Sequence, residues 1–398
     1  MAEGATKDKF EGGGWNNQKE EYKVLLWAIH NFGLLYADQG KLDEAEKMYM
    51  LALKGREKAL GAEHASTLNT VHKLGDLYED QGKLDEAEKM YMRALEGREK
   101  ALGAENTSVL HTVNNLGNLY RDRGKLDEAE KTYMQALEGY EKALGVEHTS
   151  TLNTVNNLGN LYRDRGKLDE AEKMYLQALE GYEKALGREH ISTLLIVNNL
   201  GLLYVDKGML DEAEKMFMRA LEGREKALRA EHTSTLHIVN NLGNLYRNRG
   251  KLDEAEKMYL QALEGYEKAL GREHTSTLLT VNNLGLLYVD KGMLDEAEKM
   301  FMRALEGREK ALGAEHTLTL NTVNNLGNFY MDQGKLDKAK KMYLQALEGY
   351  EKALGREHIS TLLTVNNLGL LYADKGKLDE AEKMFMRALE GYEKAIVP

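Results

Sequence analysis

The sequence predicts an all-α solenoid of nine helix-turn-helix repeats. A unit close to LxxVNNLGxLYxDxGKLDEAEKMYxxALEGxEKALGxEHTST recurs with a fixed step of 42 residues, and its central glycine falls at Gly33, Gly75, Gly117, Gly159, Gly201, Gly243, Gly285, Gly327 and Gly369. So strict an internal period indicates a repeat protein in which each unit contacts only its neighbours. Apolar residues recur within each unit at helical spacing. We therefore expect an extended surface rather than a closed catalytic pocket.

The period also sets the domain boundaries. Residues 1–20 share nothing with the repeat, and three consecutive glycines with mixed charge predict a flexible leader. Helix is expected from about Glu21. The array then covers residues 21–398, with repeats at 26–67, 68–109, 110–151, 152–193, 194–235, 236–277, 278–319, 320–361 and 362–398.

One unit, residues 110–151, shows why each repeat should form two helices. Residues 110–121 carry an apolar stripe at Leu110, Val113, Leu116, Leu119 and Tyr120, and Gly124 can end this helix in a left-handed conformation. Residues 126–144 form the second helix, with carboxylates in its first turn, where they favour the helix dipole. Gly145 ends it. The short turn between the helices predicts that they run antiparallel.

Two positions go against local helix preferences. Gly139 lies in the middle of a second helix and recurs in every repeat, at a cost of about 1 kcal/mol relative to alanine. This predicts the close approach of a neighbouring helix. Arg229 replaces the helix-ending glycine found in other repeats, and a left-handed conformation there would cost about 1–2 kcal/mol. Repeats 5 and 7 differ at three positions, of which this is one.

Composition excludes several classes of protein. No apolar run approaches 18 residues, so no membrane span or membrane partner is expected, and no secretory h-region is visible. The absence of cysteine fits a reducing compartment and predicts a cytoplasmic location. A net charge of −11 argues against a nucleic-acid partner, because binding nucleic acid depends on neutralising phosphates.

The sequence predicts no catalytic residue, no metal site and no cofactor, and therefore no enzyme. A histidine recurs in the connectors, but one zinc ion needs all its ligands at about 2 Å, whereas packed helices lie about 10 Å apart. A turn or capping role is expected for His64, His148, His190, His232, His274, His316 and His358. The LDEAEK carboxylates are expected to be a solvated face. The second-helix methionines are core filler or, alternatively, a soft binding surface.

The order Leu116-Gly117-x-x-Tyr120, followed by Ala129-x-x-x-Tyr133 and a further alanine, resembles the tetratricopeptide repeat (TPR) signature. TPR units normally have 34 residues and often a closing proline, which is missing here. The 42-residue form resembles kinesin light chain repeats and, more closely, C-terminal arrays of fungal Nod-like (STAND-type) NTPases. No Walker A loop and no kinesin-binding heptads occur. The resemblance implies a right-handed superhelix whose first helices line a concave groove.

Helical spacing then selects the groove residues. An Asn-Asn pair recurs in the first helices, and an asparagine side chain offers both a donor and an acceptor to the backbone of an extended peptide. Each such bond is worth only about 1 kcal/mol net, so several must act together. The predicted peptide-binding residues are Asn114, Asn115, Asn118, Arg121, Asn156, Asn157, Asn160, Arg163, Asn198, Asn199, Asn240, Asn241, Asn244, Arg247, Asn282, Asn283, Asn324, Asn325, Asn366 and Asn367. Alternatively, one asparagine of each pair bridges adjacent repeats. Repeats 1 and 2 carry His30-Asn31 and His72-Lys73 instead.

The neighbouring groove positions alternate along the chain. Repeats 3, 4 and 6 carry an Asn/Arg combination, whereas repeats 5, 7 and 9 carry Leu202/Val205, Leu286/Val289 and Leu370/Ala373. These bands predict a partner with alternating acidic and apolar anchors. Alternatively, the leucines pack against the next repeat.

The predicted function is non-enzymatic binding of a protein or an extended peptide in the concave groove. One alternative is a regulatory sensor arm of a fungal Nod-like NTPase receptor. Another is self-association, a homo-oligomer formed through the uncapped C-terminal repeat that ends at Pro398.

Overall fold

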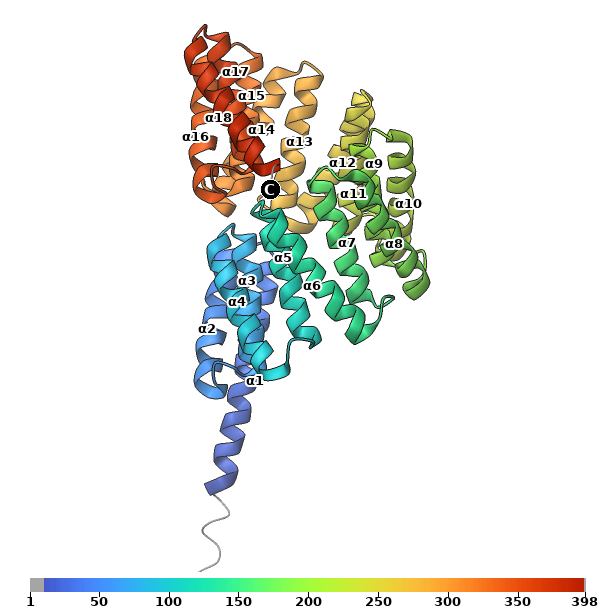
Figure 1. The fold of residues 1–398 in the computed structure, drawn as a ribbon, viewed down its shortest axis with the longest axis vertical. Coiled ribbons are helices and arrows are strands. Elements are labelled where there is room, and N and C mark those ends of the chain that lie inside the picture. Colours follow the sequence, from blue (N-terminus) through green and yellow to red (C-terminus); the bar gives the residue numbers. More distant parts are fainter. Residues whose placement is uncertain (1–10, 397–398) are drawn as a thin grey trace, which may run out of the picture. The chain divides into compact units, whose positions relative to one another are not determined.

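In the computed structural model, residues 11–396 are described, and every regular element among them is an α-helix (Figure 1). The first helices of the repeats are α1 Glu11–Asp38, α3 Ala65–Asp80, α5 Thr107–Asp122, α7 Thr149–Asp164, α9 Ile191–Asp206, α11 Thr233–Asn248, α13 Thr275–Asp290, α15 Thr317–Asp332 and α17 Ile359–Asp374. The second helices are α2 Leu42–Leu60, α4 Leu84–Leu102, α6 Leu126–Leu144, α8 Leu168–Leu186, α10 Leu210–Leu228, α12 Leu252–Leu270, α14 Leu294–Leu312, α16 Leu336–Ala353 and α18 Leu378–Ile396.

The predicted all-α repeat fold is confirmed, and its helices group into two compact units that divide within α5. The first unit ends at Asn115 and the second begins at Leu116. Helix α1 begins at Glu11, earlier than the onset predicted at about Glu21. Residues 1–10 of the predicted leader lie outside the described residues, as does Pro398.

The turn inside each repeat is built by hydrogen bonds that glycine permits. At the end of α5, Gly124 has φ 73°, and its N–H donates to the carbonyl of Arg121 at 2.9 Å. The N–H of Lys125 donates to the carbonyl of Tyr120 at 2.8 Å, which completes a Schellman motif. The Lys125 ammonium lies 5.9 Å from the Tyr120 ring centroid. This turn reverses the chain, so that α7 and α8, for example, lie side by side (Figure 1).

The connector between repeats depends on a histidine and a threonine. Gly187 is the C-cap of helix α8 and has φ 91° and ψ 163°, and the Thr193 hydroxyl donates to its carbonyl at 2.8 Å. His190 is the N-cap of α9, since its Nδ1 accepts from the N–H of Ser192 at 3.1 Å. The same cap is made by His64, His148, His232, His274, His316 and His358. The predicted capping role of these histidines is therefore confirmed.

Arg229 keeps the backbone conformation of the glycine that it replaces. It has φ 81° and ψ 159°, and it is the one non-glycine residue with positive φ among residues 11–396. The left-handed sign of φ is thus kept, but a ψ of 159° makes the connector extended here rather than left-handed helical. This region is populated almost exclusively by glycine, and a side chain in it costs about 1–3 kcal/mol.

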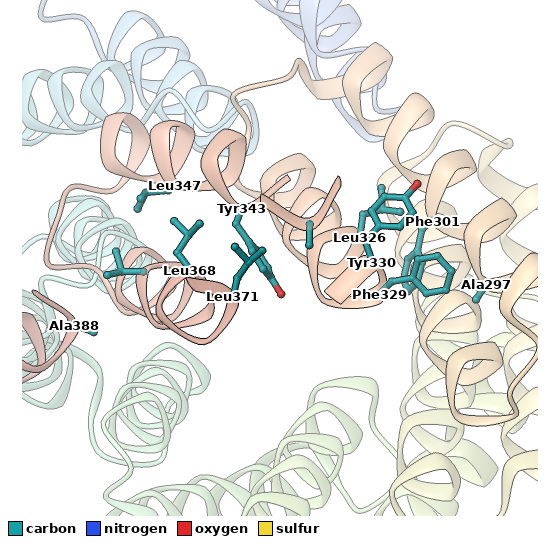
Figure 2. Close-up of a cluster of buried hydrophobic side chains, with 12 residues drawn as sticks. Ala297, Phe301, Leu326, Phe329, Tyr330, Tyr343, Leu347, Leu368, Leu371 and Ala388 are labelled. Atoms are coloured by element: carbon teal, nitrogen blue, oxygen red, sulfur yellow. The ribbon is translucent and has the colours of Figure 1, made fainter. Parts of the chain in front are cut away.

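The two recurrent helical glycines allow close packing, as predicted for the position of Gly139. A Cβ on its counterpart Gly181 would lie 2.4 Å from Leu152 Cδ2 of the same repeat, and a Cβ on Gly159 would lie 2.7 Å from the Tyr175 ring. Within each unit, clusters of buried side chains extend from one repeat into the next. Figure 2 shows one of these clusters, where Phe301 packs beside Phe329 with ring centroids 5.7 Å apart.

Candidate functional site: the first-helix face

In the second unit, the exposed side of the first helices forms a row with one residue from each of repeats 4 to 9. We call this row, together with the partly exposed side chains one and two turns further along each helix, the first-helix face. In the second unit the row consists of Asn153, Leu195, His237, Leu279, Asn321 and Leu363, all exposed. Successive first helices approach each other in the pairs α7–α9, α9–α11, α11–α13 and α15–α17, more closely than successive second helices do. The hydrogen bond from Asn325 to Asn282 joins the remaining pair, α13 and α15, so the row is a continuous surface of the second unit.

The asparagine pairs join one repeat to the next. In five of the pairs, the second asparagine donates from Nδ2 to the Oδ1 of the first asparagine in the preceding repeat, 43 residues earlier. These bonds are Asn199 to Asn156 and Asn241 to Asn198 at 2.9 Å each, Asn325 to Asn282 at 3.2 Å, and Asn283 to Asn240 and Asn367 to Asn324 at 3.4 Å each. In the first unit, Asn115 Nδ2 lies 3.2 Å from Nε2 of His72, which holds the first-asparagine position. We call this series the asparagine ladder.

The ladder decides how much of each predicted peptide-binding asparagine remains accessible. Seven are buried, namely Asn114, Asn156, Asn157, Asn198, Asn240, Asn241 and Asn282. Partial exposure remains at the other ten, namely Asn115, Asn118, Asn160, Asn199, Asn244, Asn283, Asn324, Asn325, Asn366 and Asn367. Bridging between repeats, the alternative role, is thus present in the structure. Contact with a ligand stays a prediction, and the partly exposed asparagines are better placed for it.

The asparagine that precedes the arginine of the predicted basic band is hydrogen-bonded to an aromatic residue of the core. The Oδ1 atoms of Asn118, Asn160 and Asn244 each accept from a tyrosine hydroxyl at 2.6 Å, those of Tyr133, Tyr175 and Tyr259 respectively. Asn328 accepts from Tyr343 at 2.8 Å. Where the groove residue is leucine, in repeats 5, 7 and 9, the aromatic residue is Phe217, Phe301 or Phe385, which has no hydroxyl to satisfy. Sequence reasoning missed this coupling, although the paired exchange, 15 residues apart, is visible in the sequence.

The predicted basic band is electrically balanced within the array. Arg163 donates to Asp206, and Arg247 Nε lies 2.5 Å from Asp290, in each case at the end of the next first helix. Arg121 Nε lies 3.5 Å from Asp164 in the same register. These guanidinium groups are about a quarter exposed. A partner would therefore have to compete with the aspartates for them.

The apolar residues predicted for the groove in repeats 5, 7 and 9 lie partly in the core and partly at the surface. Leu202 and Val205 pack against the cluster of Phe217, Ile238 and Leu242, which extends into the next repeat. Leu286 and Val289 pack in the same way against the cluster around Phe301 and Phe329. The alternative role of these residues, packing against the next repeat, is thus present. Leu370 in repeat 9 is instead 49% exposed.

The second-helix carboxylates also join repeats, which the sequence analysis missed. Glu130 accepts from the hydroxyl of Tyr162 at 2.8 Å and pairs with Arg165 at 2.9 Å, both in the following repeat. The glutamates at the same position in four later repeats each accept from the next tyrosine, namely Glu172, Glu214, Glu256 and Glu298. The aspartate of the LDEAEK segment also reaches the following repeat, as in the pair of Asp169 with Lys207 at 2.8 Å. A solvated face therefore explains only the other acidic residues of the segment.

Buried arginines occupy one second-helix position in several repeats. Arg56, Arg224 and Arg308 are 5%, 6% and 2% exposed, and within residues 23–393 no carboxylate lies at ion-pair distance from any of them. Burial lowers the pKa of Arg308 to about 10, an effect that Tyr350 partly opposes. The same position holds Tyr140, Tyr182, Tyr266, Tyr350 and Tyr392 in other repeats. An isolated buried cation is costly, so these arginines call for an explanation.

Within the described part of the chain, no group of three or more histidine or acidic side chains is arranged to hold a metal ion. Nor does any helix there combine the length and apolar character needed to cross a membrane.

Stacked antiparallel helix pairs with a repeating inter-helix hydrogen-bond ladder define a helical-repeat protein. A family model described as tetratricopeptide repeat matches residues 24–100, 107–184, 152–226, 232–310, 277–328 and 318–394. The chain belongs to the tetratricopeptide repeat family. No curated protein matches it.

Several solved structures are similar. A putative kinesin light chain from Podosopora anserina, with nearly identical TPR-like repeats, is 27% identical over 51% of this chain and 96% of its own, with a TM-score of 0.43. The quorum sensor NprR from B. thuringiensis, in its apo form, is 16% identical over 94% of this chain and 99% of its own, with a TM-score of 0.55. A Rap protein complexed with Competence and Sporulation Factor is 16% identical over 84% and 99%, with a TM-score of 0.56. The last two likenesses concern the fold.

Proposed function

We propose that this protein is a non-enzymatic scaffold that binds an extended polypeptide along its first-helix face. The observation that carries the proposal is the row of exposed residues, in which Leu195, Leu279 and Leu363 alternate with Asn153, His237 and Asn321. Because each row position recurs once per repeat, a ligand would meet apolar and polar contacts in turn. Solenoid arrays commonly use such an extended surface for binding.

The asparagine ladder supports this proposal by fixing the register of the row. Each ladder bond ties a first helix to its neighbour, so the exposed residues are held in place before a ligand arrives. Preorganisation of this kind reduces the entropy lost on binding. The partly exposed asparagines, such as Asn199 and Asn283, keep an N–H and an acceptor lone pair beyond their ladder bond. We propose that these groups bind the ligand backbone.

Selection of random peptides displayed on phage tests the proposal, with the immobilised full chain as the target. The enriched peptides are then measured against two triple variants. One variant changes Leu195, Leu279 and Leu363 to serine, and these leucines are 42%, 38% and 49% exposed. The matched control changes Leu176, Leu260 and Leu344 to serine, which are 47%, 46% and 44% exposed on the second helices.

We expect the first triple variant to bind at least about tenfold more weakly, a loss of about 1.4 kcal/mol, because its apolar anchors are gone. The control should bind as the unchanged protein does. If no peptide is enriched, or if only the control variant loses binding, the first-helix face is not the binding surface.

A second candidate function is self-association, and a specific feature of α18 favours it. Leu378 and Leu389 are 69% and 51% exposed there, and Phe385 is only half-buried, whereas its counterpart Phe301 is fully buried. Another copy of the chain could cover this apolar face. Light scattering over a range of concentrations tests the idea, because a constant monomer mass rules it out. A role as the sensor arm of a larger NTPase receptor remains a prediction from the sequence.

A further inference from the structure

A cavity of about 170 Å³ opens on the first-helix face of the second unit. Its lining includes His237 and Leu279, which belong to the exposed row, together with Asn240, Tyr266, Thr280 and Arg308. The lining side chains come from five consecutive helices, α11 to α15. A ligand lying along the first-helix face would therefore pass over the mouth of this cavity.

Arg308 gives the cavity a buried positive charge with incomplete partners. Its Nη1 donates to the carbonyl of Leu318 at 2.7 Å and to the hydroxyl of Thr322 at 2.6 Å. Its Nε is buried without any hydrogen-bond partner. A guanidinium carries five N–H donors, and both acceptors it has found are neutral. Among the described residues no carboxylate balances its charge.

The same arrangement recurs in the first unit at the same position of the repeat. Arg56 lines a cavity of about 330 Å³ together with Trp27 and Ser66. Its Nη1 donates to the Ser66 carbonyl at 2.8 Å and to the Thr70 hydroxyl at 2.6 Å. A buried arginine facing a cavity, with neutral acceptors only, is therefore not peculiar to one repeat.

We propose that the Arg308 cavity is a subsite for a carboxylate of the bound polypeptide. The carboxylate enters between His237 and Leu279 and accepts hydrogen bonds from the Arg308 guanidinium, which pairs with carboxylates in a charge-assisted geometry. The polar side chains of Asn240 and Thr280 line its path. The inference rests on the proposed function and deepens it, because it assigns the ligand an acidic group at a defined point. That group is either an Asp or Glu side chain or the C-terminal carboxylate.

Titration with small probes tests the subsite without a known ligand. N-acetylglutamate α-amide carries only a side-chain carboxylate, N-acetylglycine only a terminal one, and N-acetylglycine amide neither. The readout is the Nε–H signal of Arg308 in NMR spectra of the full chain at constant ionic strength. Arg308→Tyr, which installs the residue of five other repeats, identifies the signal by removing it. Arg308→Lys provides the same assignment if the tyrosine variant fails to fold.

We expect one or both carboxylate probes to shift the Arg308 signal saturably, and the amide to leave it unchanged. The probe that shifts it identifies the source of the carboxylate. Burial lowers the pKa of Arg98, and the Asp76 carboxylate partly opposes this effect; Arg98 therefore has a carboxylate near it and serves as an internal control whose signal stays fixed. Peptides selected on the array should bind Arg308→Tyr at least about tenfold more weakly, the loss expected for a charge-assisted hydrogen bond.

An Arg308 signal that responds to no carboxylate, or equally to the amide, would overturn the subsite. In that case, selected peptides that still bind would leave the proposed function standing. Conversely, a carboxylate-specific shift without any enriched peptide would support the anion site and contradict the polypeptide-binding function.

Discussion

Repeats 5 and 7 have almost the same sequence but different local strain. They differ only at Ile196/Thr280, Arg229/Gly313 and Ser234/Leu318. The connector backbone is nevertheless the same, since Gly313 has φ 90° and ψ 162° where Arg229 has φ 81° and ψ 159°. The connector hydrogen bond is also kept, with Thr235 donating to the Arg229 carbonyl at 3.0 Å and Thr319 to the Gly313 carbonyl at 2.8 Å.

The comparison teaches that stacking against neighbours, rather than local preference, sets the shape of a repeat. A second difference points the same way. Arg224 and Arg308 are buried at the same position, but Arg308 reaches a threonine hydroxyl, whereas residue 238 in the corresponding place beside Arg224 is isoleucine. Arg224 is therefore left with a single carbonyl acceptor, that of Ser234 at 3.2 Å. The fold retains both arginines in spite of this difference.

Exchanging the connector residues of repeats 5 and 7 should change the local stability of these repeats more than any other substitution considered below. Arg229→Gly should stabilise repeat 5 by about 1–3 kcal/mol, and Gly313→Arg should destabilise repeat 7 by a similar amount, because each change removes or adds a side chain at positive φ. Hydrogen exchange of the α10 and α14 amides measures the two local opening free energies. Equal stability of the unchanged repeats and of both variants would show that Arg229 is not strained.

Removing the threonine hydroxyl beside the buried arginine should cause the next largest change in local stability. Thr322→Val removes one of the two acceptors of Arg308 and keeps the volume, so we expect a loss of about 1.5 kcal/mol in the local stability of α14 and α15. Ile238→Thr is the matched change beside Arg224 and should be stabilising. Hydrogen exchange measured at increasing urea concentrations compares the local stabilities of the two variants. The interpretation fails if Thr322→Val has no cost.

The hydrogen bonds of the asparagine ladder should contribute smaller energies, both at repeat 5 and at repeat 7. A double-mutant cycle with Asn198→Ala and Asn241→Ala should give a coupling energy of about 0.5–1.5 kcal/mol. The equivalent cycle at Asn282 and Asn325, whose bond is 3.2 Å long rather than 2.9 Å, should give no more than this. Strictly additive single mutants in both cycles would mean that the ladder bonds do not stabilise the stack.

The smallest expected effect is a pH dependence of stability in repeat 6, which carries a histidine where repeat 8 carries an asparagine. His237 in repeat 6 corresponds to Asn321 in repeat 8. Its side chain is exposed at the surface, but the protein atoms around the imidazole desolvate it, and this effect, followed by the Arg224 charge, lowers the pKa of His237 below 6.5. The unfolded chain then binds more protons than the folded one, so stability decreases as pH falls below 6.5. His237→Asn should make the slope of α11 stability shallower between about pH 7 and pH 5. An unchanged slope would contradict the shift.

The fold could be predicted from the sequence because its signals repeat. The spaced glycines, the apolar stripes and the connector histidines each occur in most repeats. Helices, turns and caps could therefore be assigned, because the same signal supported each assignment in many repeats. The ψ of Arg229 could not be predicted, since a glycine only indicates that positive φ is allowed. The start of α1 also could not, because Gly12–Gly14 oppose helix locally and the residues there lie outside the repeat.

The candidate site was only partly predictable. Periodicity selected the correct helices, but it could not tell that Asn156 would be an acceptor for Asn199 while Asn199 stays partly exposed. The pairing of Arg163 with Asp206 lies across a repeat boundary, 43 residues apart, and depends on the stacking geometry. The buried Arg308 was missed because charged residues on a second helix usually lie in solvent. Its exchange with tyrosine in other repeats was the available signal.

Photo-crosslinking from two positions of one repeat tests the central claim, binding along the first-helix face, most directly. A photoreactive p-benzoylphenylalanine replaces Leu279 in one sample and Met302 in the other, side chains that are 38% and 49% exposed on α13 and α14. With a peptide selected on the unchanged protein, we predict a crosslink from position 279 and none from position 302. Crosslinking from position 302 alone would contradict the account.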